Sequence, residues 1–118
     1  MTNLNIYPTT TEHTEKIDDT HTLIEKQWTI GGYTLVRSHY ATAEGIIGKP
    51  DWTVRSASRD LPEITDVSTR FAPLPKFGVN WSAMGTRSVK ETREYAELLK
   101  DAARVAERFT LIAEWNRD

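Results

Sequence analysis

The sequence holds few side chains of the kinds that carry out catalysis. It has no cysteine, which excludes thiol nucleophiles, thiolate metal sites and disulfides. Ser82 stands shortly before Gly85, but position 80 is asparagine where a nucleophile elbow has its leading glycine. The three histidines, His13, His21 and His39, lack the paired spacing of metal ligands. We therefore expect no catalytic residue, no metal ion and no cofactor.

Arginine and aromatic side chains favour a binding function instead. Arg, Trp and Tyr are the residue types most enriched where interfaces gain their binding energy. Trp52 directly follows a turn signal, Lys49-Pro50-Asp51, which predicts an exposed indole. The predicted partner-binding surface consists of these residues: Trp52, Tyr40, Arg55 and Arg59.

A second cluster follows from the hairpin expected around Gly31-Gly32. A two-residue turn there places Lys26 opposite Arg37, and like charges directly opposite each other destabilise a sheet. Three arrangements resolve the conflict: an acidic side chain between the two cations, long stems that carry both charges to the rim, or a bound anion. The third predicts a pocket between sheet and helix, formed by these residues: Lys26, Arg37, His39 and Trp81.

Length and charge limit the class of protein. A chain of 118 residues suffices for one domain with its own core. Its net charge of −2 disfavours nucleic-acid binding through bulk charge. No apolar run approaches the roughly 18 residues of a membrane span, and the first residues lack the pattern of a signal peptide. We expect a cytoplasmic protein with a protein partner and without membrane contact.

Short runs of alternating apolar and polar residues predict an antiparallel meander. The firmest unit is the hairpin at Gly31-Gly32, whose two-residue loop fixes the register of both strands. Residues 41–51 are expected to form a connection with at most a brief strand at 46–47. In the run 64–71, the expected buried side carries Thr65, Val67, Thr69 and Phe71. The expected strands are residues 23–30, 33–40, 52–58, 64–71 and 77–84.

One long amphipathic helix is predicted at the end of the chain. Ser88 and Glu91 fit the S-x-x-E capping box that begins a helix. Apolar residues then recur at three-four spacing from Val89 to Phe109, and residues 110–115 either continue the helix or fray. Its many alanines allow close packing on a sheet or against a second copy of the helix.

The strand before this helix and the helix itself resemble a known segment. The residues Val-Asn-Trp-Ser-Ala-Met-Gly at 79–85, followed by the capping box and an Ala/Leu/Glu-rich helix, are similar to a segment of small, functionally uncharacterised proteins of actinobacteria and their phages. The resemblance covers about the last third of the chain. It implies a strand–turn–helix unit and a host range, and it brings no activity or site.

These patterns predict an α+β fold, in which an antiparallel meander of four or five strands packs on one long C-terminal helix. Residues 1–20 are threonine-rich and poor in apolar side chains, which predicts a flexible arm, or an edge strand anchored by Leu4, Ile6 and Tyr7. Residues 21–118 form the domain. The predicted function is a non-enzymatic protein-binding module that self-associates, such as a phage or mobile-element accessory protein that inhibits a host defence complex. The alternative is a small-molecule-binding or enzymatic domain with the pocket described above.

Overall fold

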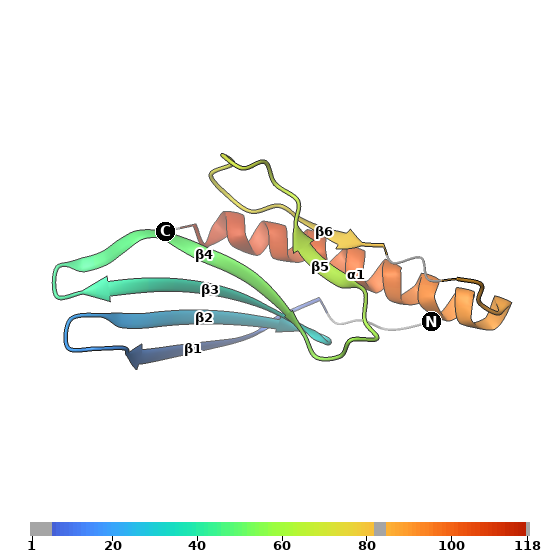
Figure 1. The fold of residues 1–118 in the computed structure, drawn as a ribbon, viewed down its shortest axis with the longest axis horizontal. Helices are drawn as coiled ribbons and strands as arrows, with labels where there is room; N and C mark the ends of the chain where they lie inside the picture. The colour runs from blue at the N-terminus through green and yellow to red at the C-terminus, as the bar shows by residue number, and fades with distance from the viewer. Residues whose placement is uncertain (1–5, 82–84, 118) are drawn as a thin grey trace.

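The computed structural model describes residues 6–81 and 85–117. The chain has an α+β fold in which strands come first and a long helix comes last, as predicted (Figure 1). The elements are β1 (Thr9–Lys16), β2 (Thr22–Ile30), β3 (Tyr33–Thr42), β4 (Gly45–Ser56), β5 (Glu63–Asp66), β6 (Phe77–Asn80) and α1 (Val89–Trp115). A four-stranded antiparallel meander has the order β1-β2-β3-β4, and β5 and β6 pair as a separate two-stranded sheet.

The β2–β3 hairpin has the predicted register. Trp28 lies opposite Leu35, and Lys26 lies opposite Arg37. The turn works because Gly31 adopts a φ of 56°, in the left-handed region that glycine enters without steric cost. Since side chains alternate along a strand, this register places Trp28, Ile30, Tyr33 and Leu35 on the sheet face that meets the helix, and all four are buried in one core with α1.

Helix α1 begins where its sequence predicts it should. The Ser88 side chain accepts a hydrogen bond from the Glu91 amide, and the Glu91 carboxylate accepts one from the Ser88 amide, so the capping box is confirmed. The helix continues to Trp115, so residues 110–115 are helical and do not fray. Its buried face, centred on the fully covered Phe109, packs on the sheets. The buried helical residues are Ala102, Val105, Ala106, Phe109, Ile112 and Ala113.

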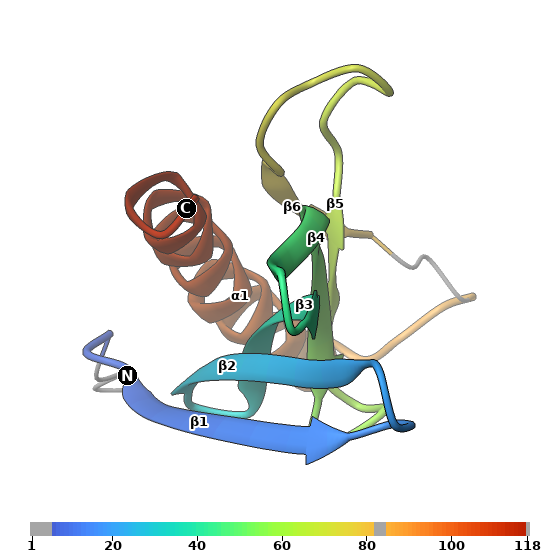
Figure 2. The same cartoon turned by 90° about the vertical axis from the view of Figure 1, so that its left-hand side faces the viewer.

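Sheet and helix are offset along the long axis of the molecule. The first turns of α1 extend past the β2–β3 turn, whereas the β1–β2 and β3–β4 turns extend past the other end of the helix (Figure 1). The molecule therefore measures 57 × 29 × 25 Å. Figure 2 shows that the loop joining β5 to β6 projects away from both the four-stranded sheet and the helix. This offset leaves surfaces at both ends of the molecule that its own core does not cover.

Two stretches predicted as an arm and a connection belong to the four-stranded sheet. Residues 9–16 form edge strand β1 within the stretch predicted to be a flexible arm, while the division of the chain at residue 20 stays a prediction. The 41–51 segment is not a connection, because β4 begins at Gly45 after a two-residue turn. The register between β3 and β4 shifts beside His39, and Pro50 of β4 lies at that shift. An edge strand with a bulge is where a sheet tolerates proline, so the proline does not break β4.

The strand after β4 was predicted with the wrong length and the wrong phase. Strand β5 ends at Asp66, and Ile64 is its buried side chain. Val67 is 59% exposed and Phe71 is 89% exposed, so neither faces the core as predicted. A second correction concerns β6, which ends at Asn80 and leaves Trp81 77% exposed. Residues 82–84, including the Ser82 considered above, lie outside the described residues.

Burial of Tyr33 makes the fold less stable as the pH rises from 10 to about 12. Its hydroxyl donates a hydrogen bond to the Pro62 carbonyl. Burial, followed by the charges of Tyr95 and Asp101, raises the pKa of Tyr33 from 10.0 to about 12. The unfolded chain therefore loses this proton first, and the stabilisation from the neutral phenol is complete below pH 10 and is lost as the pH rises to about 12.

We expect Tyr33→Phe to cost about 1 kcal/mol at neutral pH, because it removes the hydrogen bond and leaves a carbonyl unpaired. The variant should also lose less stability than the wild type between pH 10 and 12. Urea unfolding of both proteins across that range measures the difference. Parallel stability–pH curves would show that Tyr33 ionises as easily in the folded chain as in the unfolded one.

Candidate partner-binding recess

A stack of aromatic rings and cations crosses the sheet at the end of the helix. The indoles of Trp28 on β2 and Trp52 on β4 stack with ring centroids 5.9 Å apart and 23° between their planes. The Arg37 guanidinium lies 5.8 Å from the Trp28 ring centre and 6.0 Å from that of Trp52. The Lys26 ammonium lies 5.5 Å from Trp28. Cations at these distances are attracted to the negative faces of the rings, so the stack holds Trp52 in place.

The structure resolves how the sheet tolerates Lys26 opposite Arg37. Glu12 of β1 lies 3.8 Å from the Lys26 ammonium. Because β1 and β3 flank β2 on opposite sides, this carboxylate pairs with Lys26 and does not stand between the two cations as predicted. Arg37 donates a hydrogen bond of 2.7 Å to the Asn116 carbonyl at the end of α1. The helix dipole also favours a positive charge at that end of α1. Both cations therefore have partners within the chain. Their contacts do not require a bound anion.

Beside Trp52 lies an open recess of about 580 Å³. Strand β4 forms one wall, the β5–β6 loop forms another, and the end of the chain after α1 closes a third side. This placement agrees with the projecting loop seen in Figures 1 and 2. The side chains that give the recess its chemical character are Lys49, Asp51, Trp52, Asp66, Arg70 and Arg117.

The cations of the recess are available for binding. Among residues 6–81 and 85–117, no ion pair involves Lys49, Arg70 or Arg117. Arg70 stacks instead on the exposed Phe71 ring at 5.6 Å. Of the two carboxylates, Asp66 is already committed to its own loop, since one of its oxygens accepts hydrogen bonds from the Ser68 amide at 2.8 Å and the Lys76 amide at 3.2 Å.

Asp66 remains ionised while it holds this loop. Burial acts to raise the pKa of its carboxyl group, but the hydrogen bonds from Ser68 and Lys76 outweigh burial and lower that pKa below its ordinary value. The charged carboxylate therefore fixes the loop that carries Arg70 into the recess wall. The lining thus carries three basic groups, those of Lys49, Arg70 and Arg117, against two carboxylates, those of Asp51 and Asp66.

The four residues predicted as a partner-binding surface do not come together. Trp52 is only partly exposed, because it stacks on Trp28. Tyr40 is 47% exposed, and strand alternation puts it with Arg55 on the sheet face opposite to Trp52. Arg59 lines a separate groove of about 940 Å³ beside the first turns of α1. Trp52 is thus less exposed than predicted, and it lines the recess.

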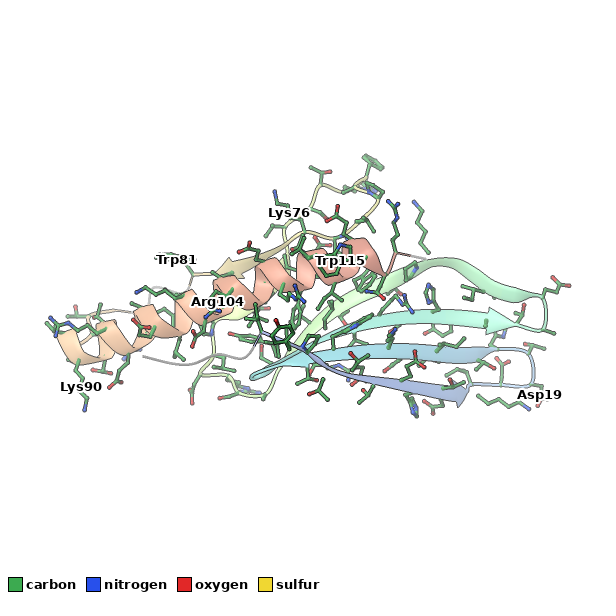
Figure 3. All side chains as sticks on the ribbon, turned by 180° about the vertical axis from the view of Figure 1, so that it is seen from behind. Asp19, Lys76, Trp81, Lys90, Arg104 and Trp115 are labelled. Carbon is green, nitrogen blue, oxygen red and sulfur yellow. The ribbon has the colours of Figure 1, made fainter. Side chains whose placement is uncertain are left out.

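The predicted pocket between sheet and helix is also divided. Lys26 and Arg37 meet on the sheet as expected, and His39 is 5% exposed on the same face. Burial, and then the charge of Arg37, lowers the pKa of His39, so the neutral imidazole is favoured there. Trp81 lies elsewhere, beside the helix and far from the β1–β2 turn marked by Asp19 (Figure 3).

The three basic residues of the recess are not among the predicted site residues. Lys49 was assigned to a turn, Arg70 lies in the segment 64–71 predicted as a strand, and Arg117 lies beyond the helical pattern. They come together because a bulged strand, a long loop and the end of the chain meet in space. A local pattern carries no signal for such a meeting.

Among residues 6–81 and 85–117, no three His, Cys, Asp or Glu side chains are placed to hold a metal ion. The described part also has no helix that is both long and apolar enough to cross a membrane. Comparisons of the chain with protein-family models, curated proteins and solved structures found no match. The chain is an α+β domain with a recess whose lining includes basic side chains and the Trp52 indole.

Proposed function

We propose that this chain is a non-enzymatic protein-binding module whose recess beside Trp52 receives an acidic segment of a partner protein. The observation that supports the proposal is the set of three basic side chains, Lys49, Arg70 and Arg117, that surround the recess without an ion pair among the described residues. Carboxylates of a partner complete these groups with charge-assisted hydrogen bonds, which are stronger than neutral ones.

The surroundings of the recess suit a protein better than a small ion. Trp52, Leu74 and Pro75 in its lining offer apolar contact. Arginine and tryptophan together are typical of the residues that carry interface energy. The recess is also open to solvent along one side, so an extended segment can enter without a conformational change of the sheet.

We further propose a biological setting for this module. A compact accessory protein of a phage or mobile element, acting in the cytoplasm by docking on a host defence complex, fits its small size and the resemblance of its last third to actinobacterial and phage proteins. The partner segment that we expect is acidic, because Lys49, Arg70 and Arg117 line the recess.

A small anionic ligand is the second candidate. A recess of about 580 Å³ lies within the range of small-molecule sites, and the same three cations would hold its phosphate or carboxylate groups. The two candidates differ in the partner that co-purifies with the chain.

A pull-down from host lysate tests the proposal with matched charge variants. The recess variant combines Lys49→Glu, Arg70→Glu and Arg117→Glu. The control variant combines Lys90→Glu, Arg93→Glu and Arg104→Glu, which change the net charge equally at exposed positions of α1. We expect the wild type and the control to capture one stoichiometric partner. The recess variant should bind it at least about tenfold more weakly, which corresponds to a loss of about 1.4 kcal/mol in binding free energy.

Mass spectrometry of the captured material identifies the partner and its acidic segment. Equal capture by the recess and control variants would show that the recess does not contact the partner. A co-purifying small anion without a protein partner would favour the second candidate. Trp52→Ala is a poorer probe, because it also removes a ring that packs on the core.

A further inference from the structure

A second hollow in the surface lies between β6 and α1. It is a groove of about 500 Å³, and none of its lining residues belongs to the recess beside Trp52. Its floor is apolar and consists largely of Val79, Ala103, Ala106 and Leu111. Lys76 and Glu107 carry opposite charges on its border, and neither forms an ion pair among the described residues.

The indole of Trp81 projects from the border of this groove. It is 77% exposed, and Figure 3 shows it pointing outward beside α1. A contrast is Trp115, whose exposed ring is covered by the Arg108 guanidinium at 5.3 Å. Among the described residues, no aromatic ring or cation covers Trp81 in this way. A large indole left in water next to an apolar groove marks an interaction site.

We propose that the occupant of this groove is a second copy of the chain, which forms a two-fold symmetric dimer. Under two-fold symmetry the same patch must serve both sides of the contact. This patch meets that requirement, because it carries both a projecting indole and an apolar groove. The Trp81 ring of each copy covers the exposed Ala103 of the other, whose small side chain allows close approach.

The charges on the border support the same occupant. In the dimer, Lys76 of each copy faces Glu107 of the other, so both meet a partner that they lack within the chain. A partner of uniform charge would satisfy one of these residues and oppose the other. The dimer leaves the recess beside Trp52 free, since the two surfaces share no residue. It therefore adds a second recess to each assembly, which strengthens binding to a partner with repeated acidic segments.

Sedimentation equilibrium across low to high micromolar concentration tests the dimer. We expect the wild type to approach twice the 13.5 kDa mass of one chain, and Trp81→Ala to remain at the mass of one chain. Trp115→Ala is the matched control, because it removes an exposed indole that does not line the groove, and it should dimerise like the wild type. Circular dichroism confirms that each variant is folded.

A charge exchange tests the proposed pairing directly. Lys76→Glu and Glu107→Lys should each weaken self-association by about tenfold, which corresponds to 1.4 kcal/mol. An equimolar mixture of the two variants should restore the dimer, since each altered charge then meets its opposite. A wild-type protein that stays monomeric throughout would overturn the proposal. So would a Trp81→Ala variant that dimerises normally, or a charge mixture that fails to recover.

Discussion

Replacing Phe109 with alanine is expected to lower the free energy of unfolding by about 3–5 kcal/mol, the usual cost of truncating a fully buried aromatic residue. Phe109 is 0% exposed and lies at the centre of the buried face of α1. Its ring meets that of Phe77 edge to face, with centroids 6.5 Å apart. The substitution therefore leaves a cavity where the helix joins the small β5–β6 sheet to the four-stranded one.

Urea unfolding followed by circular dichroism measures this effect. Phe71→Ala is the matched control, because it removes the same atoms from a ring that is 89% exposed, and it should change stability by less than about 0.5 kcal/mol. Similar losses for the two variants would mean that α1 does not pack on the sheets through Phe109.

Replacing Trp28 with alanine has the second large effect, again about 3–5 kcal/mol. Trp28 is 4% exposed, stacks on Trp52 and lies within cation–π distance of Lys26 and Arg37. Its loss also removes the support beneath Trp52. We therefore expect partner binding to weaken even at temperatures where the variant remains folded, although Trp28 does not line the recess.

Thermal unfolding and binding assays on Trp28→Ala separate these two consequences. Trp115→Ala, which truncates a ring that is 63% exposed, is the control for tryptophan loss in general. A folded Trp28→Ala variant with unchanged binding would show that Trp52 keeps its place without the stack, and that the order of the recess has another source.

Local rules in the sequence were sufficient for the hairpin and the helix. The two-residue loop at Gly31-Gly32 determines which residues face each other, and it therefore predicts Trp28 opposite Leu35. The Ser88–Glu91 capping box determines where α1 begins. In both cases the interacting groups lie within a few residues of one another, so the pattern contains the whole interaction.

Features that depend on tertiary contacts were predicted poorly. Strand β1 is exposed along its whole length and has no apolar pattern, and it forms only because the β2 edge is available for pairing. Burial of Ile64 instead of Phe71 depends on where α1 and β6 meet β5. The recess is the extreme case, since Lys49, Arg70 and Arg117 come from three segments that only the complete fold brings together.

The basic residues of this region differ in what they contact. Arg37 is structural, because it joins the tryptophan stack to the end of α1. Lys49, Arg70 and Arg117 face the recess and form no ion pair among the described residues. Composition alone does not separate these roles, and a near-neutral net charge conceals a local cationic site.

The most direct test of the recess is an NMR titration of the isotope-labelled chain with a hexaglutamate peptide, with hexalysine and inorganic phosphate as comparison probes. We predict salt-sensitive shifts with hexaglutamate that concentrate at the Trp52 indole N–H and at the side-chain N–H groups of Arg70 and Arg117, and none of comparable size with hexalysine. Phosphate shifting the same signals as strongly as the peptide would favour a small anion as ligand. Hexaglutamate shifts centred on the basic residues of α1, or absent altogether, would contradict the central claim.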